Sequence, residues 1–368
     1  MSGTVVYVTR NDPRPDGNAV LAFRRRPGGT LQPHETIPTR GRGVVNPGSQ
    51  FDTEDFDQVV QVDAGRRLLF AANGGSDSIA VLSIDAQGRL AHVDGSPFAS
   101  GGVQPVSVGI NGRYAFVVNK DRDPDRPMAG SQRNYVSFRL TDTGQLAAVS
   151  TVAVPAGSSP SQALVAREGR LVFGADLRAG VLQSFRVGDH GRLDQLSPTP
   201  VESSLPSPLG LAVHPIRPIL YAGLPAARRV GVYTFDDAGR LSAVTTVPNS
   251  GIATCWLAVN AGGTTLFTSN NADNSVSVYD LTDPLAPVEV QHLPLAGGSA
   301  AYQLCLDPAG DRLYVVSTNA ASGRREDNVL HQLAVATDGR LSDPTGPIAL
   351  EVANGAQPAG VAVLRVST

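Results

Sequence analysis

Short apolar stretches recur along the chain, and residues 65–93 show the pattern in its simplest form. Residues 68–73 form an apolar run, residues 78–84 alternate apolar and polar side chains, and residues 85–90 turn the chain into a third short stretch. A short apolar run between turn residues is typical of a buried strand, and alternation is typical of a strand with one buried face. The pattern predicts a hairpin with a third strand, a unit that needs neighbours to cover both of its faces.

This unit recurs about every 45 to 59 residues, which is the spacing of β-propeller blades. Six copies carry a Gly-x-Leu turn before the third strand, at Gly29-Thr30-Leu31, Gly88-Arg89-Leu90, Gly144-Gln145-Leu146, Gly191-Arg192-Leu193, Gly239-Arg240-Leu241 and Gly339-Arg340-Leu341. In the seventh copy, residues 283–287 (Asp-Pro-Leu-Ala-Pro) replace that turn. A leading strand is expected ahead of six hairpins, at residues 58–63, 104–110, 161–166, 209–214, 255–260 and 302–307.

The two ends of the chain each hold one part of the remaining blade. Residues 5–10 have the pattern of a second strand without a leading strand before it, and residues 358–364 that of a leading strand without a hairpin after it. In a closed ring these two strands would pair and leave no open edge. We therefore predict an all-β fold, a seven-bladed β-propeller closed by its N- and C-terminal strands, as one domain over residues 1–368. A β-solenoid and two sandwiches are the alternatives, and the complementary ends argue against both.

Composition agrees with a turn-rich β protein and limits the possible partners. The chain contains 39 Gly and 27 Pro in 368 residues, and its net charge is -3. That charge gives no electrostatic reason to expect nucleic acid or an anionic membrane as a partner. The apolar stretch before Arg10 is too short for a signal peptide, and no run approaches the ~20 apolar residues of a membrane span. We expect a cytoplasmic monomer that binds a small molecule and needs no cofactor or metal.

In a propeller, the loops that enter the leading strands and those that leave the second strands meet on one face, which we call the mouth. The residues expected to open the leading strands there are Gln58, Gln104, Ser161, Leu209, Cys255, Tyr302 and Ala359. Three loops on this face are longer than the repeat requires, at residues 40–57, 120–133 and 318–328. Long loops on a rigid scaffold often carry function, although they also tolerate neutral insertions.

The hairpins NGGSDSIAVLSIDAQGRL and NADNSVSVYDL, together with the repeat along the whole chain, resemble the propeller lactonase family of bacterial 6-phosphogluconolactonases and fungal carboxymuconate cyclases. The resemblance implies a catalytic His, Arg, Glu and Arg at the mouth. Here the matching positions hold Ser161, Leu209, Pro225 and Asn271. Opening or closing a lactone needs a group that moves a proton and donors for the developing oxyanion. None of the four residues supplies the proton-transfer group, so other residues must carry any lactone chemistry.

The remaining polar residues of the mouth provide the candidates. Asp12 and Asp121 are candidate proton-transfer groups, and Lys120, the only lysine, is a candidate Schiff-base residue whose simpler interpretation is an exposed surface position. Arg10 and one of Arg324 and Arg325 are expected to hold an anion together with Lys120. The residues predicted to shape the substrate pocket are Gln104, Gln162, Trp256, Asn271 and Gln303.

Other motifs carry little chemistry. The chain has no GxSxG nucleophile elbow, HExxH motif or Cys/His cluster. Residues 121–125 resemble the start of a calcium loop but lack its later Gly and Glu, so we interpret them as a solvated acidic loop. Cys255 and Cys305 do not form a disulfide framework, although one bridge between them stays open. His214 is expected in a turn on the face opposite the mouth.

These observations predict a lactonase- or cycloisomerase-like protein, a hydrolase or isomerase, that acts on or binds a small oxygen-rich, carboxylated ligand at the mouth. The alternative is a non-catalytic binding or scaffold propeller that has lost the catalytic residues of the family. A mouth closed by the 120–133 loop, with no cavity of a few hundred Å³, would favour the alternative.

Overall fold

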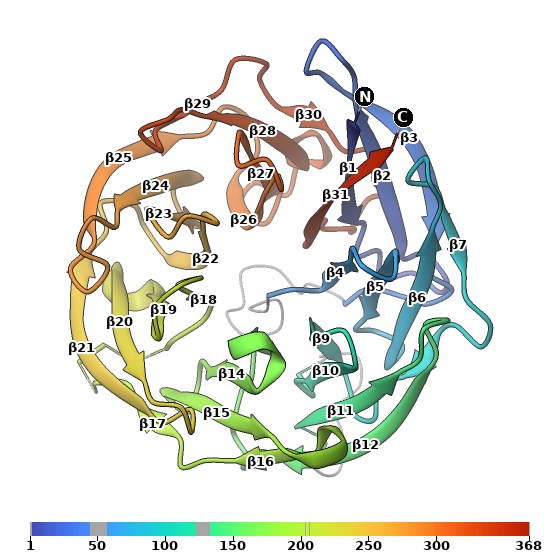
Figure 1. Ribbon diagram of the computed structural model, residues 1–368. Helices are drawn as coiled ribbons and strands as arrows, with labels where there is room; N and C mark the ends of the chain where they lie inside the picture. Colours follow the sequence, from blue (N-terminus) through green and yellow to red (C-terminus); the bar gives the residue numbers. More distant parts are fainter. Residues whose placement is uncertain (1, 45–56, 123–132, 203, 206, 368) are drawn as a thin grey trace.

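The computed structural model describes residues 2–44, 57–122, 133–202, 204–205 and 207–367, and these form seven antiparallel sheets around a central axis (Figure 1). Each sheet is one blade. From the axis outward, blade 1 contains β31 (Val361–Ser367), β1 (Ser2–Thr9), β2 (Ala19–Arg25) and β3 (Leu31–Pro38). Blade 2 contains β4 (Val60–Asp63), β5 (Leu68–Asn73), β6 (Ser78–Ile84) and β7 (Leu90–His92), with β8 (Phe98–Ala99) also on β6. Blade 3 contains β9 (Pro105–Ile110), β10 (Tyr114–Asn119), β11 (Asn134–Leu140) and β12 (Leu146–Ala153).

The other four blades repeat this order. Blade 4 contains β13 (Leu164–Ala166), β14 (Leu171–Asp176), β15 (Val181–Val187) and β16 (Leu193–Gln195), with β17 (Thr199–Pro200) on β15. Blade 5 contains β18 (Leu211–Val213), β19 (Ile219–Leu224), β20 (Arg229–Phe235) and β21 (Leu241–Pro248). Blade 6 contains β22 (Thr254–Val259), β23 (Thr265–Asn270), β24 (Ser275–Asp280) and β25 (Val288–Pro294). Blade 7 contains β26 (Ala300–Leu306), β27 (Arg312–Thr318), β28 (Val329–Val335) and β29 (Leu341–Ser342), with β30 (Ile348–Ala349) on β28. The prediction of an all-β, seven-bladed propeller is confirmed.

Blade 1 is built from both ends of the chain. Strand β31 pairs antiparallel with β1 from Ser2↔Ser367 to Val8↔Val361. Thr9 continues the contact, because its amide donates to the Gly360 carbonyl over 3.1 Å. Figure 1 shows the N and C ends next to each other, with β31 nearest the axis. The predicted closure by N- and C-terminal strands is therefore confirmed.

The Gly-x-Leu signature has a backbone cause. Gly88 adopts a φ of +84°, and a Cβ at this position would lie 2.6 Å from Val5 of blade 1, so only glycine fits without strain. The φ angles of the six turn glycines all lie between +81° and +89°, at Gly29, Gly88, Gly144, Gly191, Gly239 and Gly339. The leucine that follows begins the outermost strand in all six blades, as the sequence predicts.

Five leading strands begin later than the sequence predicts, among them β9 at Pro105 rather than at 104 and β31 at Val361 rather than at 358. Strand β4 begins at Val60 rather than at residue 58, β13 at Leu164 rather than at 161, and β18 at Leu211 rather than at 209. Ahead of these strands the chain makes some backbone hydrogen bonds to other blades as well as to its own. The amide of Gly210, for example, donates to the Cys255 carbonyl of blade 6 over 3.0 Å.

Apolar side chains of adjacent blades pack against each other around the whole ring. Phe116, Phe70 and Tyr135 are fully buried in the largest cluster, which joins blades across the ring. Among the described residues, no helix is long and apolar enough to cross a bilayer.

A buried histidine in blade 7 is expected to make the stability of the fold depend on pH. His331 on β28 is 0% exposed, and its Nδ1 lies 3.8 Å from Oδ2 of Asp343. Neither ring nitrogen has a hydrogen-bond partner in the part of the chain that the structure describes. Burial lowers the pKa of His331 to about 4, against the attraction of the Asp343 carboxylate. The folded protein therefore keeps this imidazole neutral in a pH range where the unfolded chain protonates it.

We expect the free energy of unfolding to fall as the pH drops from 6.5 towards 4, because the unfolded state then binds one proton more than the folded state at this residue. The loss between pH 7 and pH 4.5 should be roughly 2 to 3 kcal/mol for His331 alone. Denaturant titrations at both pH values measure it. His331→Leu should remove this part of the pH dependence, whereas His190→Asn, in an exposed turn, should keep it. An unchanged pH dependence in His331→Leu would contradict the assignment.

Candidate functional site

A short segment ahead of β4 crosses the tunnel at the mouth and ties three blades together. The amide of Asp57 donates to the Ser161 carbonyl of blade 4 over 3.0 Å, and the Gln58 carbonyl accepts the Val108 amide of blade 3 over 3.0 Å. Nε2 of Gln162 also donates to Oε1 of Gln58 over 3.2 Å. In Figure 1 the blue segment before β4 reaches into the centre of the ring. The start of blade 2 thus lies across the tunnel entrance.

Asp57 is a buried carboxyl group within this crossing segment. The residue is 8% exposed, and its Oδ1 accepts the Gln58 amide over 2.7 Å. Burial raises the pKa of Asp57 to about 7, and the hydrogen bond from the Gln58 amide opposes the rise only in part. A carboxyl group that is half protonated near neutral pH is suited to proton transfer.

Asp57 was not among the candidates from the sequence. It ends the long 40–57 loop, and a loop position gives no indication of burial. The available signal was a carboxylate directly before Gln58, a residue expected to open a leading strand at the mouth.

The predicted residues of blade 1 form an ion-pair cluster. Asp12 is 0% exposed, and its Oδ2 lies 2.6 Å from Nη2 of Arg14 and 3.9 Å from Nη1 of Arg10. Burial acts to raise the pKa of Asp12, but the hydrogen bonds and charge of Arg14, helped by Arg10, outweigh it and hold this pKa below its usual value. Asp12 is therefore a stable carboxylate at neutral pH and a weaker candidate for proton transfer than Asp57.

The predicted residues of blade 3 lie together at the end of β10. The Lys120 amide donates to the Gln104 carbonyl over 2.9 Å, and the Asp121 amide donates to the Val103 carbonyl over 3.0 Å. Gln104 and Lys120 are 0% exposed, and Asp121 is 8% exposed. The interpretation of Lys120 as an exposed surface residue is wrong. A buried ammonium group at this depth is strongly desolvated, which keeps Lys120 among the candidates.

The other predicted pocket residues make contacts between blades. Gln162 bridges to blade 5, because its Oε1 accepts the Leu211 amide over 2.7 Å and its Nε2 donates to the Leu211 carbonyl over 3.2 Å. Trp256 of blade 6 lies against Tyr302 of blade 7, with ring centroids 3.9 Å apart. Asn271 donates to the Ala301 carbonyl over 3.1 Å. Gln303 is 3% exposed. The contacts of Gln162, Trp256 and Asn271 therefore help to hold neighbouring blades together.

The positions that the resemblance gives to catalytic residues also hold structural contacts. Oγ of Ser161 donates to the Leu209 carbonyl over 3.0 Å, and Leu209 is 1% exposed. Pro225 begins the short 3-10 helix η3 (Pro225–Ala227). The side chains of Ser161, Leu209 and Pro225 offer no group that could take a proton from water near neutral pH.

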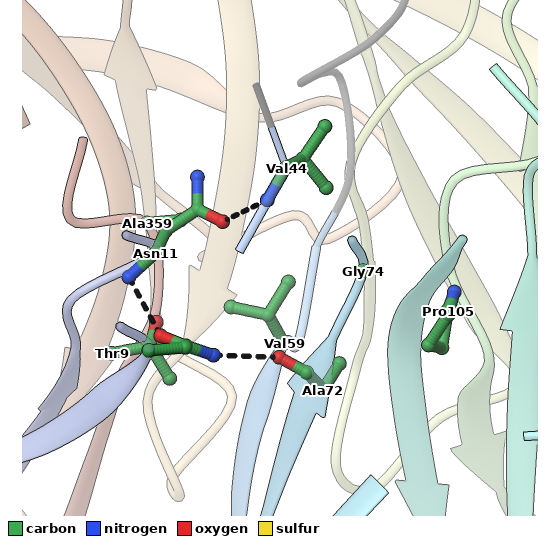
Figure 2. Close-up of a pocket in the computed structure, with 9 residues that line it drawn as sticks. Thr9, Asn11, Val44, Val59, Ala72, Gly74, Pro105 and Ala359 are labelled. Atoms are coloured by element: carbon green, nitrogen blue, oxygen red, sulfur yellow. Dashed lines mark hydrogen bonds between the residues drawn. The ribbon is translucent and has the colours of Figure 1, made fainter. Parts of the chain in front are cut away.

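A cavity of about 10 Å³ lies at the mouth between blades 1, 2 and 3, which is room for about one water molecule. Figure 2 shows Asn11 and Val44 on one side of it and Val59 and Ala72 on the other. The Val44 amide donates to Oδ1 of Asn11 over 2.8 Å, so the 40–44 segment is fixed over blade 1.

The long loops and remaining motifs contribute less to the site. Nη2 of Arg324 lies 2.9 Å from Oδ2 of Asp327, so one of the two arginines that were expected to hold an anion is already paired with a carboxylate. Most of the 40–57 and 120–133 loops, with Asp123 and Asp125, lies outside the described residues. Cys255 and Cys305 are free thiols, so the possible bridge is absent. His214 follows the leading strand of blade 5 on the opposite face, as expected.

Comparison with known proteins agrees with this architecture. Residues 192–316 match the model of the family described as "Lactonase, 7-bladed beta-propeller". No curated protein matches the sequence. Three solved structures share the fold, each at low identity. A Lactobacillus plantarum protein has 16% identity, a TM-score of 0.74 and coverage of 99% of this chain and 100% of that chain. A candidate 6-phosphogluconolactonase from Bacteroides uniformis has 16% identity, a TM-score of 0.73 and 99% coverage of both chains.

The third is the periplasmic gluconolactonase of Pseudomonas aeruginosa, with 17% identity, a TM-score of 0.73 and 100% coverage of both chains. At these identities the structures establish the fold alone. The sequence match runs from the end of blade 4 through blades 5 and 6 into β27 of blade 7. Residues 192–316 are thus similar to the propeller lactonase family, and the complete ring of seven blades agrees with the fold in that family's description.

Proposed function

We propose that the protein hydrolyses a lactone of a small oxygen-rich, carboxylated acid at the mouth of the tunnel. The observation that carries the proposal is Asp57, a carboxyl group at the mouth whose pKa of about 7 fits it for proton transfer. Asp57 supplies the proton-transfer group that is missing from Ser161, Leu209, Pro225 and Asn271. Arg10, with its side chain 23% exposed at the same face, is available to bind a carboxylate.

In this mechanism Asp57 acts as the general base. It removes a proton from a water molecule whose oxygen attacks the lactone carbonyl carbon. The ring C–O bond then breaks, and the departing alkoxide takes the proton back from Asp57, which gives the open hydroxy acid and restores the base. A base with a pKa near 7 is partly ionised at neutral pH and strong enough to assist the attack. The amine of Lys120, buried at the same face, is the proposed hydrogen-bond donor to the developing oxyanion.

A panel of aldonolactones, phosphorylated aldonolactones and muconates tests the proposal. We expect turnover of at least one lactone, measured as proton release in weak buffer. We also expect ligand-dependent thermal stabilisation, corresponding to about 2.7 kcal/mol at a hundredfold excess over Kd. The open hydroxy acid of the same lactone is the matched control for binding without reaction. Neither turnover nor stabilisation with any compound would overturn the proposal.

A non-catalytic binding or scaffold propeller is the second candidate. It is favoured by the segment at Asp57 and Gln58 across the tunnel, and by the water-sized cavity between blades 1, 2 and 3. Stabilisation by both the lactone and its open acid, without turnover, would support this candidate over the enzyme. The cycloisomerase activity, the monomeric state and the cytoplasmic location stay predictions; the related Pseudomonas aeruginosa structure is described as periplasmic.

A further inference from the structure

A second cleft opens on the face opposite the mouth, where the leading strands of blades 3, 4 and 5 end. Its volume is about 660 Å³, within the range of small-molecule sites. Asn111 lines it from blade 3, residues 165–170 line it from blade 4, and residues 213–217 with Phe235 line it from blade 5. This cleft lies at the other end of the leading strands from Asp57, so it is distinct from the proposed lactone site.

The lining of this cleft is strongly positive. It contains three guanidinium groups, from Arg167, Arg170 and Arg217, and one carboxylate, from Glu168. The whole chain carries a net charge of -3, so this is a local reversal of sign. Several cations in one concave site raise the local concentration of anions and bind them more tightly than scattered surface charges do.

Arg167 is held in place by contacts that do not use all of its N–H donors. Its guanidinium carbon lies 5.5 Å from the ring centroid of Phe235, and its Nη2 lies 3.5 Å from Oδ1 of Asp237. Its Nε is buried and has no hydrogen-bond partner among the residues that the structure describes. The Arg167 side chain is 35% exposed, so the accessible part of its guanidinium group can bind an anionic oxygen in the cleft.

Hydrogen bonds fix the turns that carry the other two arginines. Arg167 and Glu168 adopt left-handed φ angles of +50° and +54°, and Nδ2 of Asn111 donates to the Gly169 carbonyl over 3.0 Å. In blade 5, Nδ1 of His214 accepts the amides of Ile216 and Arg217 over 3.1 and 3.0 Å. Two successive non-glycine residues in this conformation store strain of the kind found at ligand sites. The arginines are thus carried on preformed turns.

We infer that this cleft is a second ligand site, which binds a small organic dianion such as a dicarboxylate or a phosphate monoester. The three guanidinium groups outnumber the two nearby carboxylates, Glu168 in the lining and Asp237 paired with Arg167, which leaves one net positive charge for the ligand. Arginine pairs with carboxylate and phosphate through paired hydrogen bonds, and Phe235 and Ile216 supply apolar surface for the carbon skeleton. The volume admits a metabolite and excludes a folded domain.

Calorimetric titration at low ionic strength tests the site with succinate, glycerol 3-phosphate and the uncharged succinamide. We expect at least one dianion to bind the wild-type protein, with an affinity that falls as NaCl is added. Arg217→Gln and Arg170→Gln should each weaken that binding by at least about tenfold, because each removes a charge-assisted hydrogen bond. Arg240→Gln is the matched control, since Arg240 is exposed in an outer turn and pairs with Asp236.

Comparing the affinities of succinate and glycerol 3-phosphate shows whether the cleft prefers a dicarboxylate or a phosphate monoester, because the preferred class should bind more tightly. Circular dichroism and Tm of each variant separate lost binding from lost folding, and both arginines are exposed enough for the variants to fold. Binding of neither dianion would overturn the inference. Equal weakening by Arg240→Gln, or equal binding of succinamide, would also overturn it, because each would show that the arginines of the cleft are not the determinants.

Discussion

A chain that lacks residues 359–368 is expected to be insoluble or strongly destabilised, because the deletion removes β31 and opens the ring. Val361, Leu364 and Val366 of this strand are at most 5% exposed, and Val6 and Val8 of β1 are 0% exposed. Burying each such side chain contributes roughly 1.5 to 3 kcal/mol. Their sum is comparable with the ~5 to 15 kcal/mol that stabilises a whole protein. Soluble yield and thermal unfolding measure the effect.

Two point variants on β31 provide a matched comparison for the deletion. Leu364 is 4% exposed, whereas the next residue, Arg365, is exposed. Leu364→Ala should lower the free energy of unfolding by about 2 to 5 kcal/mol, and Arg365→Ala should change it much less. If the deleted chain melts within a few degrees of the full chain, the pairing of β1 with β31 does not stabilise the ring.

Asp57→Asn is expected to reduce lactone turnover by at least about a hundredfold, since a general base typically contributes 10² to 10⁴ in rate. In the wild-type protein, kcat/KM should fall as the pH drops below about 7, because protonated Asp57 cannot accept a proton. The residual kcat/KM of the variant should not show this fall with pH. Asp237→Asn is the control, since Asp237 is 95% exposed on an outer turn. Full activity in Asp57→Asn would remove Asp57 from the mechanism.

The same variant should make the protein more stable in alkaline solution. The pKa of Asp57 is higher in the folded state than in the unfolded chain, so the folded state binds the extra proton between about pH 4 and 7 and loses stability as the pH rises through that range. At pH 8 the buried carboxylate costs about 4 kcal/mol, which Asn avoids. Denaturant titration should therefore show Asp57→Asn to be stabilised at pH 8 and much less so at pH 4. An equal effect at both pH values would contradict the raised pKa.

The fold could be predicted from the sequence because its determinants are local and repeated. The turn glycines need a positive φ that other residues rarely adopt, so they mark the hairpins wherever the blade is copied. The matching halves of blade 1 at residues 5–10 and 358–364 then specify closure, since a strand without its partner leaves an open edge. Both features follow from periodicity and need no knowledge of distant contacts.

The candidate site could be predicted only in part, because burial at the mouth depends on contacts between blades. Lys120 follows a strand and looks like a surface residue, yet it is 0% exposed. Asp57 ends an irregular loop, and its position depends on a hydrogen bond to Ser161, 104 positions further along the chain. No local pattern encodes such a contact. The Arg167 turn was missed for the same reason, since its partner Phe235 belongs to another blade.

The pairing of β1 with β31 also sets the time at which this protein can finish folding during its synthesis. About 350 residues separate the two strands, and a ribosome adds about 5 to 20 residues per second. The inner edge of β1 therefore waits roughly 20 to 70 s for its partner after it is made. Until then Val6 and Val8 lack the strand that covers them. The nascent chain therefore exposes an unpaired apolar strand edge, which is the kind of surface that chaperones bind.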